Sequence, residues 1–234
     1  MIRLRPAAER GHFNHGWLDT QHTFSFAHYY DPRHMAFRAL RVINEDRIAP
    51  SQGFGTHGHE DMEILTWVLS GHLTHRDSMG HEQALGVNEI QRMSAGTGVL
   101  HSEYNASPTE PLHLLQIWLL PARSGHEPSY EQFAIDPAEK QNRWRTLASP
   151  EGGDRIARIH QDARLLVTTL DPGRELATAI DPARHAWLQI SRGSVELNGQ
   201  ALTAGDGVAI SNDSGFTLKT TSSEPSEVLF FDLA

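Results

Sequence analysis

Short apolar runs separated by turn residues limit the fold of this chain more than any other feature. The runs are rich in Val, Ile, Leu and aromatic residues, and Gly, Pro, Ser or Asn commonly ends them. They include 39–43, 62–69, 112–120, 187–190 and 228–231. Runs of this kind are typical of β-strands, and many of them at close spacing indicate a β-sandwich or β-barrel. We therefore expect an all-β protein with few short helices.

One short helix is expected near the middle of the chain. Asp136 is a favourable N-cap residue and Pro137 suits the first helical position, so the prediction covers 136–141. The segment falls where a linker between two halves of the chain would be expected.

The two halves resemble diverged copies of one another. Residues 93–103 align without gaps on residues 210–220. Residues 67–71 resemble residues 189–193, and the two pairs of segments stand in the same order. Each half also ends on an apolar strand. This pattern favours a duplicated β-barrel.

Composition and charge exclude several classes of protein. The chain has no cysteine, which excludes disulfide scaffolds, thiolate zinc sites and cysteine nucleophiles. Its 20 basic and 29 acidic residues give a formal net charge of −9, which argues against direct nucleic-acid binding. No apolar run is long enough for a membrane span, and the N-terminus lacks the apolar region of a secretory signal. The expected location is the cytoplasm.

Histidine is distributed unevenly along the chain. Of the 15 histidines, 13 lie at or before His126, and only His160 and His185 follow it. Histidine is the commonest metal ligand in proteins. The first half of the chain is therefore the expected place for a metal site.

Two motifs in the first half place metal-binding side chains on one face of a strand. Residues 57–59 read His-Gly-His, and residues 101–103 read His-Ser-Glu. Residues i and i+2 of a strand share a face and lie about 6.6–6.8 Å apart along the chain. If the two strands face one another inside a barrel, three imidazoles and one carboxylate converge on a divalent transition metal. A six-coordinate metal would keep two positions free for a substrate oxygen and for O₂ or water.

The residues alone leave the identity of the carboxylate ligand open. Glu103 belongs to the same motif as His101. Glu63 follows His59 closely and has the same strand parity as His57. Strand parity does not decide between the two carboxylates.

Most of the other histidines are expected to have ordinary roles. We interpret His12, His15, His72, His75 and His126 as surface, loop or hydrogen-bonding residues. Glycines are dense beside both histidine motifs, where they let the backbone turn tightly around converging ligands. The same glycines also suit the turns of a barrel without a metal.

The second half lacks the metal-binding side chains. In the alignment of the two halves, Leu218 and Thr220 stand where the first half has His101 and Glu103. We therefore expect a second barrel that kept the fold and lost the metal.

These motifs resemble those of the pirin family, in the bicupin branch of the cupin superfamily. The segments that carry the resemblance are 10–20, 22–32, 55–64, 93–105 and 114–118. The resemblance implies two tandem cupin (jelly-roll) β-barrel domains. The N-terminal metal-binding domain would span 1–133, and a C-terminal domain without metal ligands would span 134–234.

The resemblance also implies a set of metal ligands. They are His57, His59, His101 and Glu103, and Glu63 is left outside the set. The implied metal is Fe(II), although Mn, Co, Ni, Cu and Zn also suit three imidazoles and a carboxylate.

The resemblance to bacterial members of this family implies quercetin 2,3-dioxygenase activity. The chain would then be an oxidoreductase that takes a flavonol and O₂, opens the heterocycle and releases carbon monoxide. The metal would lower the pKa of the flavonol 3-hydroxyl, and Glu103 would take the proton as the catalytic base. Several aromatic residues of the first half would either line the pocket or pack in the core: Phe24, Phe26, Phe54, Trp67 and Trp118.

The family resemblance implies a second function as well. Pirins also act as metal-dependent regulatory partners of other proteins, with the oxidation state of iron changing a surface. Tyr29, Tyr30 and Arg33 would then be contact residues. The partner would be a protein, because an acidic chain is poorly suited to direct DNA binding. Turnover of quercetin by metal-loaded protein distinguishes the two functions.

Overall fold

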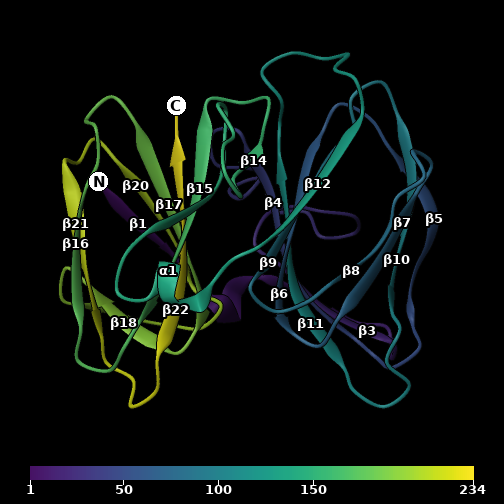
Figure 1. Cartoon of the computed structure of the whole chain (residues 1–234). Coiled ribbons are helices and arrows are strands. Elements are labelled where there is room, and N and C mark those ends of the chain that lie inside the picture. The colour runs from purple at the N-terminus through teal and green to yellow at the C-terminus, as the bar shows by residue number, and fades with distance from the viewer. The chain divides into compact units, whose positions relative to one another are not determined.

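The computed structural model describes all 234 residues and divides into two compact units. The N-terminal unit consists of Gly11–Ile135 and Glu151–Gln161. The C-terminal unit consists of Met1–Arg10, Asp136–Pro150 and Asp162–Ala234. Each unit is built from two antiparallel β-sheets (Figure 1), so the predicted all-β, two-cupin fold is confirmed. The sheets form open jelly-roll sandwiches and do not close into complete barrels.

The larger sheet of the N-terminal unit has seven strands. In order across the sheet they are β12 (Ser129–Ala134), β9 (Glu89–Ser94), β6 (Glu63–Ser70), β11 (Leu112–Leu119), β4 (Leu40–Ile48), β3 (Leu18–His22) and β2 (Gly11–Asn14). The apolar runs at 39–43, 62–69 and 112–120 form β4, β6 and β11, as predicted. Their apolar side chains are buried because they supply the core between the two sheets.

The smaller sheet of the N-terminal unit carries the two histidine motifs. In order its strands are β5 (Gly53–His59), β10 (Val99–Asn105), β7 (Leu73–Asp77) and β8 (Glu82–Leu85). Leu73 and Leu85 of this sheet pack against Ile48, Leu112 and Leu114 of the larger sheet. This apolar cluster holds the two sheets together at one end of the sandwich and leaves the histidine motifs beside it.

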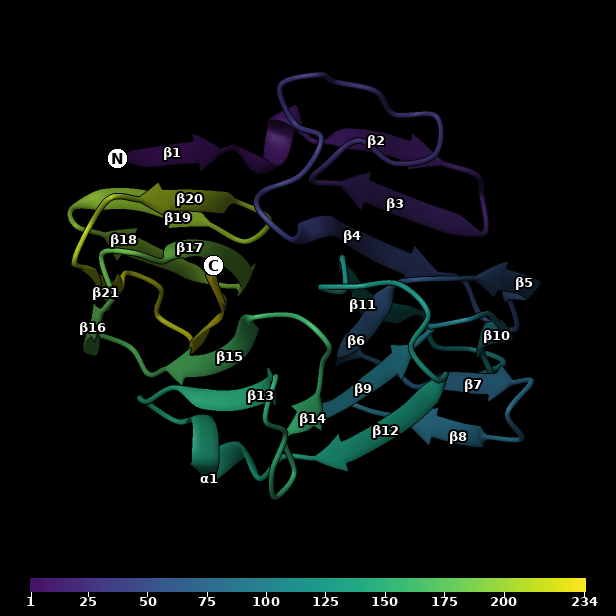
Figure 2. The ribbon, with the colours of Figure 1, turned by 90° about the horizontal axis from the view of Figure 1, so that it is seen from above.

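The C-terminal unit contains a second pair of sheets. Across its larger sheet lie β1 (Ile2–Arg5), β20 (Gly207–Ser211), β17 (His185–Arg192), β22 (Ser226–Leu233), β15 (Ala163–Leu170) and β13 (Arg145–Ser149). Its smaller sheet contains β16 (Glu175–Ala179), β21 (Gly215–Thr220), β18 (Ser194–Leu197) and β19 (Gln200–Thr203). Figure 2 shows β1 running beside β20, its hydrogen-bonded neighbour. The short strand β14 (Ala157–Arg158) lies in the second segment of the N-terminal unit.

The two units repeat one strand order, in agreement with the duplication inferred from the sequence. The neighbours β9, β6, β11 and β4 of the N-terminal unit correspond to β20, β17, β22 and β15 of the C-terminal unit. The smaller sheets correspond in the same way, from β5, β10, β7, β8 to β16, β21, β18, β19. The aligned segments 93–103 and 210–220 fall on equivalent strands, the first on β9 and β10 and the second on β20 and β21.

At equivalent positions the interiors of the two units differ in chemistry. In the N-terminal unit His57 pairs with His101, and in the C-terminal unit Leu176 pairs with Leu218. Leu218 is fully buried in an apolar cluster, and Leu176 packs against that cluster. The hydroxyl of Thr220 donates a hydrogen bond to a backbone carbonyl of its own unit. Packed apolar side chains therefore occupy the place that the histidines take in the N-terminal unit.

The chain passes between the units more than once. Residues 1–10 group with the C-terminal unit, because β1 adds to the edge of its larger sheet, and residues 151–161 group with the N-terminal unit. The domain bounds 1–133 and 134–234 stay a prediction.

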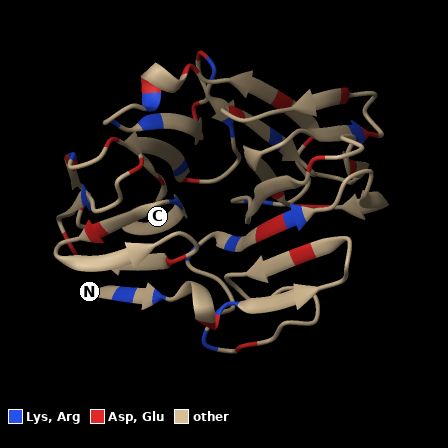
Figure 3. Ribbon diagram, turned by 90° about the horizontal axis from the view of Figure 1, so that it is seen from below, with Lys and Arg blue, Asp and Glu red and all other residues tan.

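Helices are few and short. The expected helix forms as α1 (Pro137–Lys140), and the Asp136 carboxylate accepts a hydrogen bond from the Ala138 N–H at 2.9 Å. A single turn of 3₁₀ helix, η1, spans Ala7–Glu9. None of the helices has the length and apolar character needed to cross a membrane. Figure 3 shows Lys and Arg interspersed with Asp and Glu along the strands and loops of both units.

Candidate metal centre

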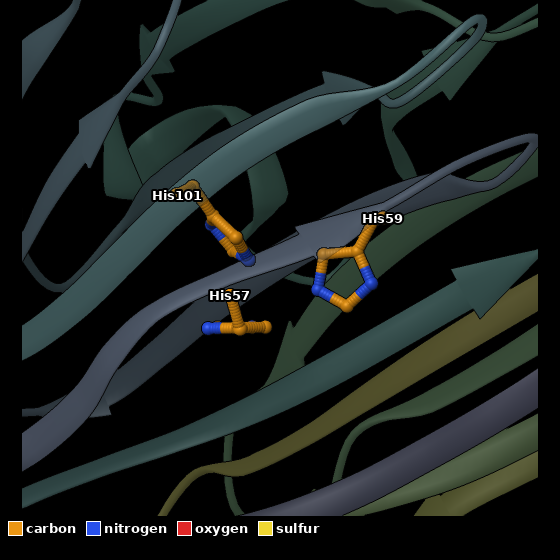
Figure 4. A group of neighbouring side chains, drawn as sticks. All are labelled: His57, His59 and His101. Atoms are coloured by element: carbon orange, nitrogen blue, oxygen red, sulfur yellow. The ribbon is translucent and has the colours of Figure 1, made fainter.

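Three histidine side chains converge inside the N-terminal unit (Figure 4). His57 and His59 lie on β5, and His101 lies on β10 directly opposite His57. The ligand atoms of the three side chains lie within 4.8 Å of one another. The ring centroids are 4.4 Å apart for His57 and His101, 4.8 Å for His57 and His59, and 4.9 Å for His59 and His101. The i, i+2 spacing on two strands thus brings the motifs together as the sequence predicts.

A glycine allows β5 to approach β10 beside this cluster. A Cβ atom at Gly53 would lie 2.2 Å from the backbone oxygen of Glu103 and 2.6 Å from the Cα atom of Tyr104. The pairing of the two strands shifts register between His101 and Glu103, which marks a β-bulge. Such bulges redirect side chains next to functional sites. The close approach at Gly53 and the bulge before Glu103 therefore set the backbone geometry next to the histidines and the carboxylate.

Glu103 is buried, and only one of its two carboxylate oxygens has a hydrogen-bond partner. Its Oε2 atom accepts a hydrogen bond from Gln116 Nε2 at 2.8 Å. The Oε1 atom of Gln116 accepts from the Thr66 hydroxyl at 3.0 Å, which fixes the orientation of the amide. Glu103 Oε1 is buried without a hydrogen-bond partner. One carboxylate oxygen is thus held in place and the other is available to a ligand.

His75 forms a second close group with His101 and Glu103, although both of its nitrogens are already engaged. Its Nδ1 accepts from the amide of Gln91 at 3.1 Å, so its Nε2–H donates to Asp77 Oδ2, also at 3.1 Å. The ring lies 5.3 Å from that of His101, measured between centroids. His75 therefore packs beside His101 as a hydrogen-bonding residue whose two nitrogens are not free to bind a metal.

Glu63, the rival carboxylate in the sequence, is engaged elsewhere. It lies on β6 of the larger sheet, and neither close group of potential ligands includes it. Its Oε2 accepts from the Ser94 hydroxyl at 2.7 Å, and its Oε1 lies 3.0 Å from His160 Nδ1. The ring of His160 stacks on that of His126, with centroids 3.9 Å apart. Glu63 shares strand parity with His57, but β6 belongs to the larger sheet and β5 to the smaller one.

The pKa values of His59 and His101 suit metal binding. Desolvation and the neighbouring His57 lower the pKa of His59 to about 4. Desolvation, with smaller effects of His57 and His59, lowers the pKa of His101 to about 3. His57 donates from Nδ1 to the Gly55 carbonyl at 2.8 Å, which leaves its Nε2 lone pair free. Neutral imidazoles with free lone pairs are what a transition metal requires.

Unsatisfied atoms at the cluster also fit a cation. Both ring nitrogens of His101 and one oxygen of Glu103 are buried without hydrogen-bond partners. Burial and the nearby charge of Asp46 raise the pKa of Glu103 to about 8. A divalent cation beside this carboxylate would favour its ionised form. The three imidazoles, the carboxylate and their atoms without hydrogen-bond partners therefore fit a divalent metal.

A cavity of about 260 Å³ opens beside the cluster. The aromatic side chains Phe26, Phe54 and Trp118 line it, and Trp118 meets His59 edge-on with centroids 4.9 Å apart. Phe24 and Trp67 are instead buried in the core. The set of aromatic residues singled out in the sequence thus divides between pocket and core, and the apolar cavity walls suit a flat ligand.

The residues expected to have other roles lie apart from the cluster. Tyr30 is 73% exposed. Arg33 forms a two-pronged ion pair with Asp31, with distances of 2.8 and 3.0 Å. His12 is exposed and pairs with Asp19 at 2.7 Å. These contacts are local surface interactions.

Sequence reasoning missed a row of polar residues that crosses the larger sheet. Adjacent strands place these residues directly opposite one another, which in an antiparallel sheet puts them on one face. From β3 to β9 the row contains His22, Asn44, Gln116, Thr66 and Gln91. The available signal was one polar residue in the middle of two mostly apolar strands, Thr66 in β6 and Gln116 in β11. Such residues are costly to bury unless they are hydrogen-bonded. They therefore indicate an interior that contains polar groups or binds a polar ligand.

Comparison with protein families covers both halves of the chain. The Pirin family model matches residues 3–119, and the model of the quercetinase C-terminal cupin domain matches residues 146–233. The chain is 48% identical over 233 residues to the quercetin 2,3-dioxygenase of Escherichia coli strain K12, covering 100% of this chain and 99% of that protein. It is 40% identical over 235 residues to a pirin-like protein of Caulobacter vibrioides, covering 100% of both.

Solved structures agree with this assignment. The crystal structure of the bacterial pirin YhhW from Escherichia coli, in complex with nickel(II), is 47% identical and matches with a TM-score of 0.93, covering 100% of this chain and 99% of that one. A quercetin 2,3-dioxygenase structure from Acinetobacter baumannii, 18% identical, matches with a TM-score of 0.77 over 99% of this chain and 78% of that one, which shows a shared fold. By its sequence over the full length and by its two-unit cupin architecture, the chain belongs to the pirin family.

Proposed function

We propose that this chain is a metal-dependent quercetin 2,3-dioxygenase, which opens the heterocycle of a flavonol with O₂. One observation carries the proposal. Three imidazoles and a carboxylate with one free oxygen meet beside a cavity lined by aromatic side chains. The similarity of the whole chain to the Escherichia coli protein of that name supports it.

The proposed metal ligands are His57, His59, His101 and Glu103. The free Nε2 of His57 and the orphaned atoms of His101 and Glu103 favour this set. Three nitrogens and one oxygen suit Fe(II), which we propose as the native metal, and also Mn, Co, Ni, Cu and Zn. The nickel complex of the related YhhW supports a divalent ion of this series.

The proposal confines metal binding to the N-terminal domain, for which we keep the bounds 1–133. In the C-terminal domain, 134–234, the positions equivalent to the ligands hold an apolar core. That domain would contribute a stable second sandwich and no chemistry of its own.

The residues around the cavity would position the flavonol and accept its proton. When bound, the metal would supply Lewis acidity that favours the ionised form of the 3-hydroxyl group. Glu103, whose Oε2 is held by Gln116, would take that proton while bound to the metal or released from it. Beside the bound cation, Glu103 would stay in the ionised form that accepts a proton.

The aromatic walls would hold the ring system flat and exclude water from it. Phe54 and Trp118 lie on the two sides of the histidine cluster, against His57 and His59 respectively. In the overall reaction both atoms of O₂ enter the ring-opened product, two C–C bonds of the heterocycle break, and the carbon between them leaves as carbon monoxide. Exclusion of water would protect the electron-rich substrate from side reactions.

The test is turnover by protein that has been stripped of metal and reloaded with one metal at a time. We expect loss of the flavonol absorbance and release of carbon monoxide from quercetin under O₂, and neither under nitrogen. His101→Ala should abolish both, whereas His12→Ala, which removes an exposed histidine, should leave them unchanged. Absence of turnover with iron, nickel, cobalt, manganese and copper alike would overturn the proposal.

A further inference from the structure

Two side chains of β4 line the cavity and are neither proposed metal ligands nor proton acceptors in the proposed reaction. Asn44 and Asp46 are two residues apart, so they share a face of the strand. They are only 4% and 5% exposed, and both border the same cavity as His57, His59 and Glu103. Polar side chains this deeply buried normally have hydrogen-bond partners.

Asn44 lacks such a partner on its acceptor side. Its Oδ1 atom is buried and receives no hydrogen bond. Its cross-strand neighbour Gln116 donates from Nε2 to Glu103, and no hydrogen bond reaches Asn44 Oδ1 from it. A buried acceptor left in this state is costly, and a ligand that donates a hydrogen bond would remove the cost.

Asp46 adds a second acceptor next to the first. The hydroxyl of Thr20, directly opposite on β3, donates to Asp46 Oδ1 and holds the carboxyl group in place. The Asp46 side chain remains part of the cavity wall. The wall formed by Asn44 and Asp46 therefore offers hydrogen-bond acceptors and negative charge, which favour a donor and repel an anion or a bare carbonyl.

The aromatic part of the lining defines what carries the donor. Phe26, Phe54 and Trp118 line the same cavity. A ligand that suits both the acceptors and the aromatic side chains is a flat aromatic ring bearing hydroxyl groups. Phenolic hydroxyls donate strongly and keep the ring uncharged.

We propose that Asn44 and Asp46 bind a phenolic hydroxyl group of the substrate, additional to the hydroxyl that faces the histidines. The pair would make the site selective for polyhydroxylated aromatic compounds over the same ring system with a single hydroxyl. The choice of a flavonol as the ring system rests on the proposed function. The selectivity itself is a property of binding and needs no turnover.

The experiment is calorimetric titration of metal-loaded protein under nitrogen, where no oxygenation takes place. The two probes are 3-hydroxyflavone, which has one hydroxyl group, and galangin, which has two more on the same skeleton. We expect wild-type protein to bind galangin at least about 10-fold more tightly, since sites built to bind a hydroxyl reject ligands that lack it.

Three variants locate the effect. Asp46→Asn keeps the shape and the bond to Thr20 but presents an amide in place of the charged acceptor, and Asn44→Leu removes the second acceptor at similar volume. Each should reduce the preference for galangin, measured as the ratio of the two affinities in the same variant, to about 2-fold. Arg47→Gln is the matched control, because Arg47 is the next residue of β4 and is exposed. It should behave as wild type.

The outcomes separate this inference from the proposed function. Equal affinity of wild-type protein for the two probes, or a preference that survives in both Asp46→Asn and Asn44→Leu, would overturn the inference. A preference that depends on Asp46 in a protein that does not consume quercetin would uphold the inference and refute the proposed function.

Discussion

Gln116 donates a hydrogen bond to Glu103 at 2.8 Å and so ties the larger sheet of the N-terminal unit to the carboxylate of the candidate metal centre. Thr66 donates to the same amide from the next strand at 3.0 Å. The two bonds leave Glu103 with one free oxygen. The direction of that oxygen therefore depends on β6 and β11, two strands that carry no proposed ligand.

Gln116→Leu should weaken metal binding without unfolding the protein. The substitution removes the donor to Glu103 at similar volume, and loss of such a supporting bond typically costs about 10-fold in metal affinity. Competition with a chromogenic chelator measures the change. Thr66→Val, which leaves the Gln116–Glu103 bond in place, should cost less. Equal affinities for wild type and Gln116→Leu would show that the amide does not position the carboxylate.

Gly53 and Gly55 should respond differently to alanine, although both lie on β5. A Cβ atom at Gly53 would meet the backbone of Glu103 at 2.2 Å, so β5 and β10 would have to separate beside the site. A Cβ atom at Gly55 would meet nothing closer than the Tyr104 hydroxyl at 3.8 Å. We expect Gly53→Ala to lower the free energy of unfolding by about 1–3 kcal/mol and to reduce metal content. Gly55→Ala is the control, and equal denaturation midpoints for the two variants would contradict the packing described.

Asp46 should make the metal-free protein less stable as the pH rises. Burial, opposed by the Thr20 hydrogen bond, raises its pKa from 3.8 to about 6. The folded protein then binds this proton more tightly than the unfolded chain, so the free energy of unfolding falls between about pH 4 and pH 6 and stays lower above. Asp46→Asn has no charge to bury and should stabilise the protein by about 1–3 kcal/mol at pH 8.

The check is thermal unfolding of chelator-treated wild type and Asp46→Asn at pH 8 and at pH 5. The gain from the substitution should be larger at pH 8, because at pH 5 the buried Asp46 is mostly protonated and uncharged. A gain of the same size at both pH values, or a loss at pH 8, would mean that the carboxyl group carries no such penalty.

His75→Gln should keep the metal. Both nitrogens of His75 are engaged by Asp77 and Gln91, so its closeness to His101 and Glu103 reflects support and not ligation. We expect a less stable protein with an unchanged ratio of metal to chain, measured by elemental analysis of the folded variant. Loss of metal on the scale expected for His101→Ala would place His75 among the ligands.

Strand parity predicted which side chains of each histidine motif share a face. Residues two apart on a strand share a face, and this rule needs no knowledge of neighbouring strands. The convergence of His57, His59 and His101 was predicted only on the condition that the two strands face one another, and in the structure β5 and β10 are neighbours in one sheet. The same rule could not separate Glu103 from Glu63, because parity does not say which sheet a strand joins.

The polar row could not be predicted because it depends on register between strands far apart in the chain. Gln116, Thr66 and Asn44 become neighbours only once β11 lies between β6 and β4. The path of the N-terminus escaped prediction for the same reason. Residues 1–10 look like the start of the first half, yet Ile2 pairs with Ile210.

Metal content tests the central claim, that His57, His59, His101 and Glu103 hold one divalent metal ion. The measurement is elemental analysis of untagged protein, comparing wild type with folded His101→Ala. We expect about one transition-metal ion per chain in wild type and less than about a tenth of that in the variant, because loss of one of four ligands opens the site. Full retention of metal in folded His101→Ala would contradict the ligand set.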